Sequence, residues 1–300
     1  MKPWASDSVE QPHGRGRESG TVNIPQPEFV TTPDITRLAC RDHHPSAPDA
    51  VTPARAQPPL LLMHGLAGHM GEWDDILPLL LADGHRVVTY DARGHGASTR
   101  RPRNMTRAAC VQDALALVRE LSLAPVTLLG QSLGGHTALL AAAAHPDLVH
   151  ALILIEAGPA GANPAVPSEI AAWLDSWPIP FKSPSAAAEF FGHEAWARGL
   201  EECEEGWRPR VDRDTMVSAV TELATHSYWP EWDRIRCPTL VIRGANGTMP
   251  ESEATQMKDR RPTTTAVRVI PDASHDVHLD RPAELHARVS AFLTGIGQVP

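Results

Sequence analysis

Short apolar runs alternate along most of the chain with longer stretches whose apolar residues recur at helical spacing. Such continuous apolar runs are typical of strands that are buried on both faces of a sheet. They predict eight strands, at residues 28–31, 36–41, 60–63, 86–90, 126–129, 151–155, 239–243 and 266–270. The stretches between them predict helices at residues 71–82, 106–121, 132–144, 251–258 and 282–293. Because right-handed crossovers lay successive strands side by side, the pattern predicts an α/β fold, with a mostly parallel sheet and helices on both faces.

This alternation stops between residues 158 and 236. The segment has helical propensity, is broken by prolines, and holds ten of the chain's fifteen aromatic residues. We therefore expect residues 158–236 to form a helical cap that is inserted after the sixth strand. Residues 25–157 and 237–297 would then form the α/β core. The first 24 residues are rich in Gly, Ser, Pro and charge, so residues 1–24 are expected to be a flexible tail.

Composition and charge narrow the classes of partner. The 27 Lys and Arg residues against 36 Asp and Glu residues give a net charge of −9, which disfavours nucleic acid and anionic membranes as partners. No apolar run approaches the roughly 18 residues of a membrane span, and the N-terminal residues do not resemble a secretory signal. The four cysteines are scattered with no C-x-x-C pair, so we expect a cytoplasmic protein with free thiols and no metal site.

The strongest chemical motif is G-Q-S-L-G at residues 130–134, which follows a predicted strand and opens the predicted helix 132–144. A G-x-S-x-G sequence at a strand-to-helix turn holds its serine in a strained conformation that exposes the hydroxyl group. The alternative is a glycine-rich turn whose serine only caps the helix. The context favours the first interpretation, so Ser132 is the candidate nucleophile.

A second group of residues could bind the oxyanion that forms when a nucleophile attacks a carbonyl. His64 and Gly65 end the predicted strand 60–63, and the chain can bend back there over the neighbouring strand ends. The backbone N–H groups of Leu66 and Leu133 could then form a two-donor oxyanion hole. We interpret His64 itself as a structural histidine.

A better-placed imidazole follows the last predicted strand. Residues 271–276 form a loop at the carboxyl edge of the sheet, the edge where Ser132 is also expected. His275 is therefore the candidate general base, which would take the proton from Ser132 and return it to the leaving group. A solvated loop histidine, like His278 nearby, is the alternative.

Together these motifs resemble the α/β-hydrolase superfamily over residues 28–293. The stretch D-A-R-G-H-G-A-S at residues 91–98 is similar to one found in esterases, epoxide hydrolases, haloalkane dehalogenases and cofactor-free haloperoxidases, where its role is structural. The resemblance implies an enzyme that works without a cofactor. It also implies the chain order Ser, acid, His for the catalytic triad.

The chain departs from this pattern at the triad acid. In most relatives the acid lies in the turn after the seventh strand, but residues 244–248, G-A-N-G-T, contain no carboxylate. Glu156 follows the sixth strand at the same sheet edge, an arrangement that resembles haloalkane dehalogenases and some lactonases. Glu156 is the candidate that would orient His275. Glu251 and Glu253 remain alternatives.

The cap segment predicts an apolar substrate pocket over the sheet edge. Trp173 and Trp177 lie four residues apart on one predicted helix, and with Phe181 and Trp229 they are the candidate pocket aromatics, although packing within the cap is an alternative. The four glutamates within residues 201–205 are interpreted as a solvated face.

The sequence therefore predicts a serine hydrolase that cleaves a carboxylic ester or lactone of an apolar, uncharged small molecule through an acyl-enzyme. The same residues could cleave a C–C bond or transfer an acyl group to peroxide, because one fold hosts many reactions. A ligand receptor that has lost turnover is a third possibility, suggested by the missing acid. Serine rather than aspartate at position 132 argues against an alkyl-enzyme mechanism. Nothing in the sequence indicates the oligomeric state.

Overall fold

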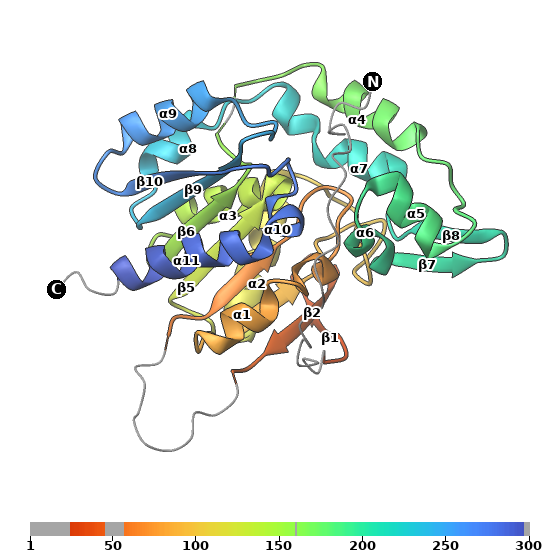
Figure 1. Cartoon of the computed structure of the whole chain (residues 1–300), viewed down its shortest axis with the longest axis horizontal. Coiled ribbons are helices and arrows are strands. Elements are labelled where there is room, and N and C mark those ends of the chain that lie inside the picture. The colour runs from red at the N-terminus through yellow and green to blue at the C-terminus, as the bar shows by residue number, and fades with distance from the viewer. Residues whose placement is uncertain (1–24, 46–56, 160, 297–300) are drawn as a thin grey trace.

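An eight-stranded sheet runs through the computed structural model of the chain, which describes residues 25–45, 57–159 and 161–296 (Figure 1). Its strands are β1 (Glu28–Thr31), β2 (Arg37–His43), β3 (Leu60–Met63), β4 (Val87–Tyr90), β5 (Val126–Gln131), β6 (Val149–Ile155), β9 (Thr239–Gly244) and β10 (Thr265–Ile270). Their order is β1-β2-β4-β3-β5-β6-β9-β10; β2 runs antiparallel to both its neighbours, and all the other neighbouring strands are parallel. The predicted mostly parallel sheet is confirmed. The expected N-terminal tail and residue 297 lie outside the described residues.

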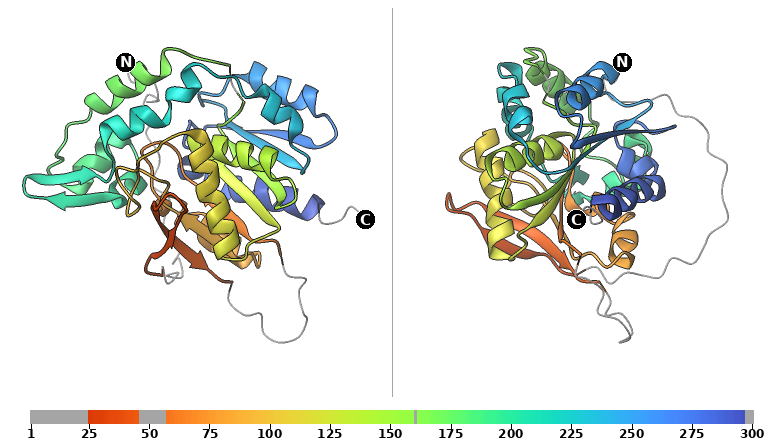
Figure 2. Two further views of the ribbon diagram at one scale, coloured as in Figure 1. Left: turned by 180° about the vertical axis from the view of Figure 1, so that it is seen from behind. Right: turned by 90° about the vertical axis from the view of Figure 1, so that its left-hand side faces the viewer.

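Helices cover both faces of this sheet (Figure 2). One layer contains α1 (Leu77–Ala82), α10 (Val277–Asp280) and α11 (Pro282–Ile296), and the other contains α2 (Arg107–Glu120), α3 (Ser132–Ala144), α8 (Trp229–Arg234) and α9 (Glu251–Arg260). Alternate residues of β3 supply both cores. Leu60 and Leu62 pack with the first layer, and Leu61 and Met63 pack with the second. Burial on both faces explains the continuous apolar runs of the central strands β3 and β6, whereas the edge strand β1 and its neighbour β2 contain several polar residues.

The helix predicted at residues 71–82 is divided in the structure. A 3₁₀ helix, η1 (Met70–Trp73), comes first, and α1 begins only at Leu77. Pro78 lies in the first turn of α1, where its missing N–H costs no helical hydrogen bond. The proline therefore favours a new helix start over a continuous helix. The short helix α10 was not predicted.

The segment after β6 contains α4 (Val166–Asp175), α5 (Pro184–Phe191), α6 (Glu194–Arg198), β7 (Leu200–Cys203), β8 (Gly206–Pro209), α7 (Arg213–Ala219) and η2 (Thr221–Ala224), which we call the cap. Most of the cap is helical, as expected, but it also contains an antiparallel hairpin of β7 and β8, which was not predicted. Gly206 makes this turn possible with φ of 142°, a conformation that favours glycine.

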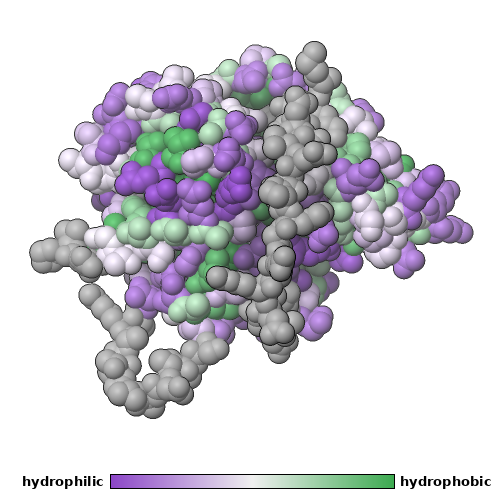
Figure 3. All heavy atoms as spheres, viewed as in Figure 1, coloured by the Kyte–Doolittle hydropathy of each residue, from purple (hydrophilic) through white to green (hydrophobic). Residues whose placement is uncertain are grey.

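The acidic run of residues 201–205 lies in this hairpin, which projects from the molecule in Figure 1. In the view of Figure 3, hydrophilic residues cover much of the surface at this end of the molecule. Glu201 forms ion pairs with Arg100 and Arg208. Beyond the cap, α8 packs against the core helix α3, and the fully buried Trp232 of α8 donates a hydrogen bond to the carbonyl of Met257.

Candidate active site

Ser132 lies at the sharp turn between β5 and α3. Its φ is 49°, in the left-handed region that is costly for a residue with a side chain. The turn is packed so tightly that a Cβ atom on Gly134 would lie 2.3 Å from the carbonyl oxygen of His64. A Cβ on Gly130 would lie 2.6 Å from the backbone of Gly134. The glycines of the motif are thus required by close backbone contacts, and the turn presents Ser132 at the edge of a cavity.

Glu156 directly follows β6 at the same edge of the sheet. Its φ is 51°, and its side chain is completely buried. Its carboxylate accepts hydrogen bonds from the backbone N–H groups of Gly244, Thr248 and Met249, with N···O distances of 2.8, 2.7 and 2.9 Å. These three donors fix the carboxylate and compensate for its burial.

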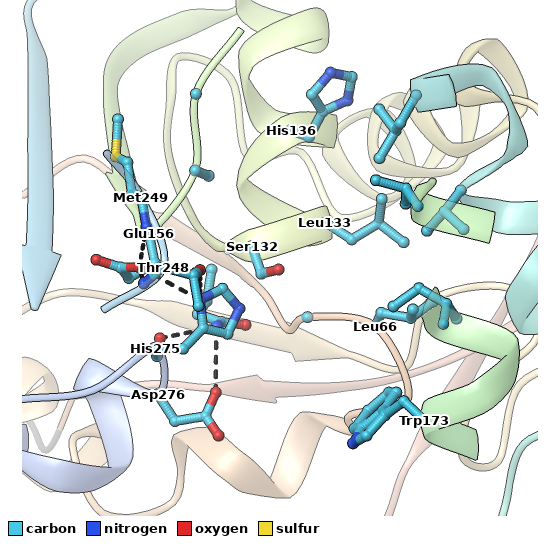
Figure 4. Close-up of a pocket in the computed structure, with 18 of the residues that line it drawn as sticks. Leu66, Ser132, Leu133, His136, Glu156, Trp173, Thr248, Met249, His275 and Asp276 are labelled. Carbon is cyan, nitrogen blue, oxygen red and sulfur yellow. Dashed lines mark hydrogen bonds and ion pairs between the residues drawn. The ribbon is translucent and has the colours of Figure 1, made fainter. Parts of the chain in front are cut away.

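His275 follows β10 and turns its Nδ1 atom toward Glu156 (Figure 4). Nδ1 lies 3.4 Å from Oε2 of Glu156 and 2.9 Å from Oγ1 of Thr248. Burial lowers the pKa of His275, but the contact with Glu156 and the negative charges of Asp276 and Glu156 raise it, and the net pKa lies above its ordinary value. The site therefore stabilises the protonated imidazole, as a general base requires.

Glu251 and Glu253, the alternative acids, both belong to the first turn of α9. Glu251 is exposed on α9, and Glu253 lines the cavity beside Gly158. The structure brings the carboxylate of Glu156, at the end of β6, to the imidazole of His275. The chain order is then Ser132, Glu156, His275.

The expected oxyanion-hole residues lie next to the nucleophile turn. A Cβ on Gly65 would lie 3.4 Å from Cβ of Ser132, so the chain at Leu66 runs directly beside this serine. Leu133 is the second residue of α3, and the first-turn N–H groups of a helix have no acceptor within the helix. The side chains of Leu66 and Leu133 both line the cavity (Figure 4).

His64 and the motif at residues 91–98 have structural contacts. Nε2 of His64 accepts a hydrogen bond from the N–H of Ala92, and Nδ1 contacts the carbonyl of Gly65. The carboxylate of Asp91 accepts hydrogen bonds from the N–H groups of Met70 and Ala97. These bonds join the chain after β4 to the chain after β3.

The cavity has a volume of about 470 Å³ and lies between the sheet edge and the cap. Trp173 lines it. The prediction was wrong for Trp177, Phe181 and Trp229, which are not among the described lining residues. Trp177 packs edge-to-face on Trp173 inside the cap.

The two other aromatics are held by contacts outside the cavity. Phe181 forms a backbone bridge to Trp207 of β8, and Trp229 lies under the guanidinium of Arg260. The fold of the cap determines which aromatic rings face the cavity. Residue spacing along one helix does not predict this fold. Trp196 and Phe190 line the cavity, although the sequence did not single them out.

Several polar lining residues were also missed. Asp276 accepts hydrogen bonds from Nε2 of Gln131 and Nε1 of Trp196, each with a donor–acceptor distance of 3.3 Å. Burial and the nearby charge of Glu72 raise the pKa of Asp276, against the opposing influence of His275 and His278, and the net pKa is raised. Asp276 and Gln131 are sequence neighbours of His275 and Ser132, and this adjacency was the available signal. Thr248 was missed because the sequence prediction for this turn concerned only a carboxylate, and a threonine hydroxyl was not considered as a partner of His275.

A protein-family model described as "Alpha/beta hydrolase family" matches residues 60–288 of the chain. The chain belongs to this family. The hydrolase is 28% identical over 253 residues to mouse "sn-1-specific diacylglycerol lipase ABHD11", with 79% of this chain and 81% of the lipase covered. The expected fold and the expectation of a hydrolase are both confirmed.

Solved structures of similar proteins agree in fold. The crystal structure of E-2-(acetamidomethylene)succinate hydrolase matches this hydrolase with a TM-score of 0.78 and 21% identity, covering 89% of this chain and 98% of that one. The enol-lactonase of Burkholderia xenovorans LB400 matches with a TM-score of 0.70 and 22% identity, covering 89% and 100%. Among the described residues of this hydrolase, no helix is both long and apolar enough to cross a bilayer.

Proposed function

We propose that this hydrolase cleaves a carboxylic ester or lactone through an acyl-enzyme, with Ser132 as nucleophile, His275 as general base and Glu156 as the acid that orients His275. The observation that carries this proposal is the contact between the buried carboxylate of Glu156 and Nδ1 of His275, in the same cavity as the strained Ser132. Nucleophile, base and orienting acid are the three parts of a serine-hydrolase triad.

In the proposed mechanism, Oγ of Ser132 attacks the carbonyl carbon of the substrate while Nε2 of His275 takes the hydroxyl proton. The N–H groups of Leu66 and Leu133 bind the oxyanion, and Glu156 stabilises the imidazolium. His275 then gives the proton to the leaving alcohol. A water molecule, activated by the same imidazole, cleaves the acyl-enzyme and restores Ser132.

The cavity favours an uncharged, apolar substrate. Apolar side chains from the cap and from the strand ends supply most of its wall, including Leu66, Leu133 and Trp173. Four carboxyl groups also reach it, and no Lys or Arg occurs among its described lining residues; the four belong to Glu72, Glu156, Glu253 and Asp276. A substrate carboxylate would find no Lys or Arg among these residues to pair with. The lipase named among the relatives agrees with an apolar ester substrate.

We also infer that the protein acts in the cytoplasm, without nucleic acid or membrane as a partner. Cys40, Cys110, Cys203 and Cys237 are free thiols in the structure. The net charge of −9 opposes binding to polyanions. Fractionation of the native cells, with detection by antibody, should recover the protein with cytoplasmic markers. Recovery with extracellular or membrane markers would contradict this inference.

The experiment that tests the proposed function is hydrolysis of a panel of p-nitrophenyl esters and simple lactones at neutral pH by the wild type and by Ser132→Ala. We expect turnover by the wild type and none by the variant. Reaction of Ser132 with a fluorophosphonate, detected by intact mass, provides a second readout that does not depend on the chosen ester. A wild type that neither turns over nor reacts would refute the proposal and favour a ligand-binding protein.

A further inference from the structure

The oxygen that lies nearest to Nδ1 of His275 among those described belongs to Thr248, not to the triad acid. Oγ1 of Thr248 lies 2.9 Å from Nδ1, whereas Oε2 of Glu156 lies 3.4 Å from it. A charge-assisted hydrogen bond between nitrogen and carboxylate oxygen usually spans about 2.7–2.9 Å. The direct contact between His275 and Glu156 is therefore long, and the contact with the hydroxyl has the ordinary length of a hydrogen bond.

Thr248 also contacts Glu156. Its backbone N–H donates to Oε2 at 2.7 Å, and its hydroxyl makes a longer contact of 3.4 Å with the same oxygen. Nδ1, Oγ1 and Oε2 thus form a triangle with one short side, from Nδ1 to Oγ1, and two longer sides of 3.4 Å that both end at Oε2 (Figure 4). A hydroxyl group can accept one hydrogen bond while it donates another, so it can act as a link between an N–H donor and a carboxylate.

The backbone explains why Oε2 does not approach the imidazole more closely. The N–H groups of Thr248 and Met249 both hold Oε2, and the N–H of Gly244 holds Oε1. These bonds keep the carboxylate under the turn of residues 244–248. The side chain of Thr248 leaves the same turn and lines the cavity beside His275.

From this geometry we propose that Thr248 is a positioning residue, whose hydroxyl accepts the Nδ1–H of His275 and donates its own hydrogen to Glu156. The proposal rests on the proposed function and adds a fourth member to the Ser132, His275 and Glu156 triad. During attack, the proton of Ser132 moves to Nε2, and the positive charge of the imidazolium is shared through Thr248 with the carboxylate. The hydroxyl of Thr248 keeps its own hydrogen throughout, so no further proton acceptor is needed.

Two substitutions separate the hydroxyl from the shape of the side chain. Thr248→Val removes the hydroxyl but keeps a branched side chain and the N–H that holds Glu156, whereas Thr248→Ser keeps the hydroxyl. We expect Thr248→Val to lower kcat/KM about tenfold, with KM changed less than kcat, and Thr248→Ser to retain activity within about twofold. Thr248→Ala repeats the test if valine does not pack.

The pKa of His275 tests the positioning role, because a merely structural role of Thr248 would leave it unchanged. It is measured by NMR titration, and the signal of His275 is assigned by its loss in His275→Gln. Removing an acceptor of Nδ1–H destabilises the imidazolium, so Thr248→Val should lower the pKa of His275 by about half a unit to one unit, and Thr248→Ser should not. Thr225→Val is the matched control. It removes an exposed hydroxyl 2.8 Å from Nδ1 of His226 and should change neither value.

Unchanged kcat/KM and unchanged titration in Thr248→Val would overturn the inference about Thr248. Because the titration needs no turnover, it tests Thr248 even if no ester is hydrolysed. Absence of turnover together with absence of fluorophosphonate reaction would refute the proposed function, whatever the titration shows. The two proposals can therefore fail separately.

Discussion

The carboxylate of Glu156 meets the imidazole of His275 across the end of a strand that lies between them. Glu156 directly follows β6 and His275 follows β10, while β9 lies between these two strands in the sheet. The two residues are 119 positions apart in the chain, and the whole cap lies between them. The carboxylate can cross the end of β9 because the turn there contains Gly247, where a Cβ atom would lie 2.2 Å from Oε1 of Glu156.

This close approach makes Gly247→Ala a test of whether the position of the Glu156 carboxylate matters for turnover. The added methyl group must displace the carboxylate, so we expect kcat to fall at least tenfold while KM changes little. Gly295→Ala is the control, because a Cβ there meets nothing within 4 Å. Steady-state kinetics with one p-nitrophenyl ester measures both. Equal activity of the two variants would show that the position of Glu156 is not important for turnover.

If Glu156 is the orienting acid that we propose, Glu156→Gln should lower kcat about 10³–10⁴-fold, the size of effect seen when the triad carboxylate of a serine hydrolase becomes an amide. The amide also cannot accept all three backbone hydrogen bonds, so we expect a loss of about 1–3 kcal/mol in the free energy of unfolding. Kinetics and urea unfolding measure the two effects. Glu253→Gln removes a carboxylate from the same cavity and should keep most of kcat; the opposite ranking would reassign the acid to Glu253.

A carboxylate at position 248 should partly replace the acid at position 156. Thr248→Asp would place a carboxylate on the turn after β9, where the hydroxyl now lies 2.9 Å from Nδ1 of His275. In a Glu156→Gln background we expect Thr248→Asp to recover kcat at least tenfold relative to Glu156→Gln alone. Thr248→Asn in the same background adds no charge and should not recover activity. Equal rates for the two double variants would argue against this relocation of the acid.

The pH dependence of kcat/KM should report the raised pKa of His275. The base must be neutral to accept the proton of Ser132, so activity falls as the pH drops through this pKa. Because the contact with Glu156 and the charges of Asp276 and Glu156 raise the pKa above the ordinary value of 6.5, the half-maximal point of the acidic limb should lie above pH 6.5. In Glu156→Gln the limb should move to lower pH. A limb that stays in place would show that Glu156 does not stabilise the imidazolium.

Substrates with a carboxylate should be poor. Between pentyl butyrate and 4-carboxybutyl butyrate, we expect kcat/KM to be at least tenfold lower for the charged ester. The reason is that four carboxyl groups and no Lys or Arg occur among the described lining residues. Asp276→Asn should narrow this difference. Glu205→Gln changes the net charge equally from an exposed position on the hairpin turn and should leave the difference unchanged. A preference for the charged ester would contradict an uncharged substrate class.

Much of this site follows from sequence alone. The apolar runs are buried on both faces of a parallel sheet, so they mark the strands with little ambiguity. Parallel strands bring their carboxyl ends to one edge, and therefore the positions of Ser132 after β5 and His275 after β10 follow from chain order. The strained turn at Ser132 has a strong glycine requirement because of its close backbone contacts.

Only the tertiary structure determined the features that depend on where side chains point and which residues they contact. Glu156, Glu251 and Glu253 carry the same side chain, so the sequence alone does not choose between them as the acid. In the structure, backbone N–H groups at the end of β9 and in the following turn hold the carboxylate of Glu156 beside His275. The role that we propose for Thr248 depends on a contact of 2.9 Å that no sequence spacing specifies. Likewise, Trp173 and Trp177 are the same residue type, close together in the chain. Only the packing of α4 to α7 determines that Trp173 faces the cavity and that Trp177 lies inside the cap. Local patterns determine the elements and their ends, whereas contacts between distant segments determine which side chains meet.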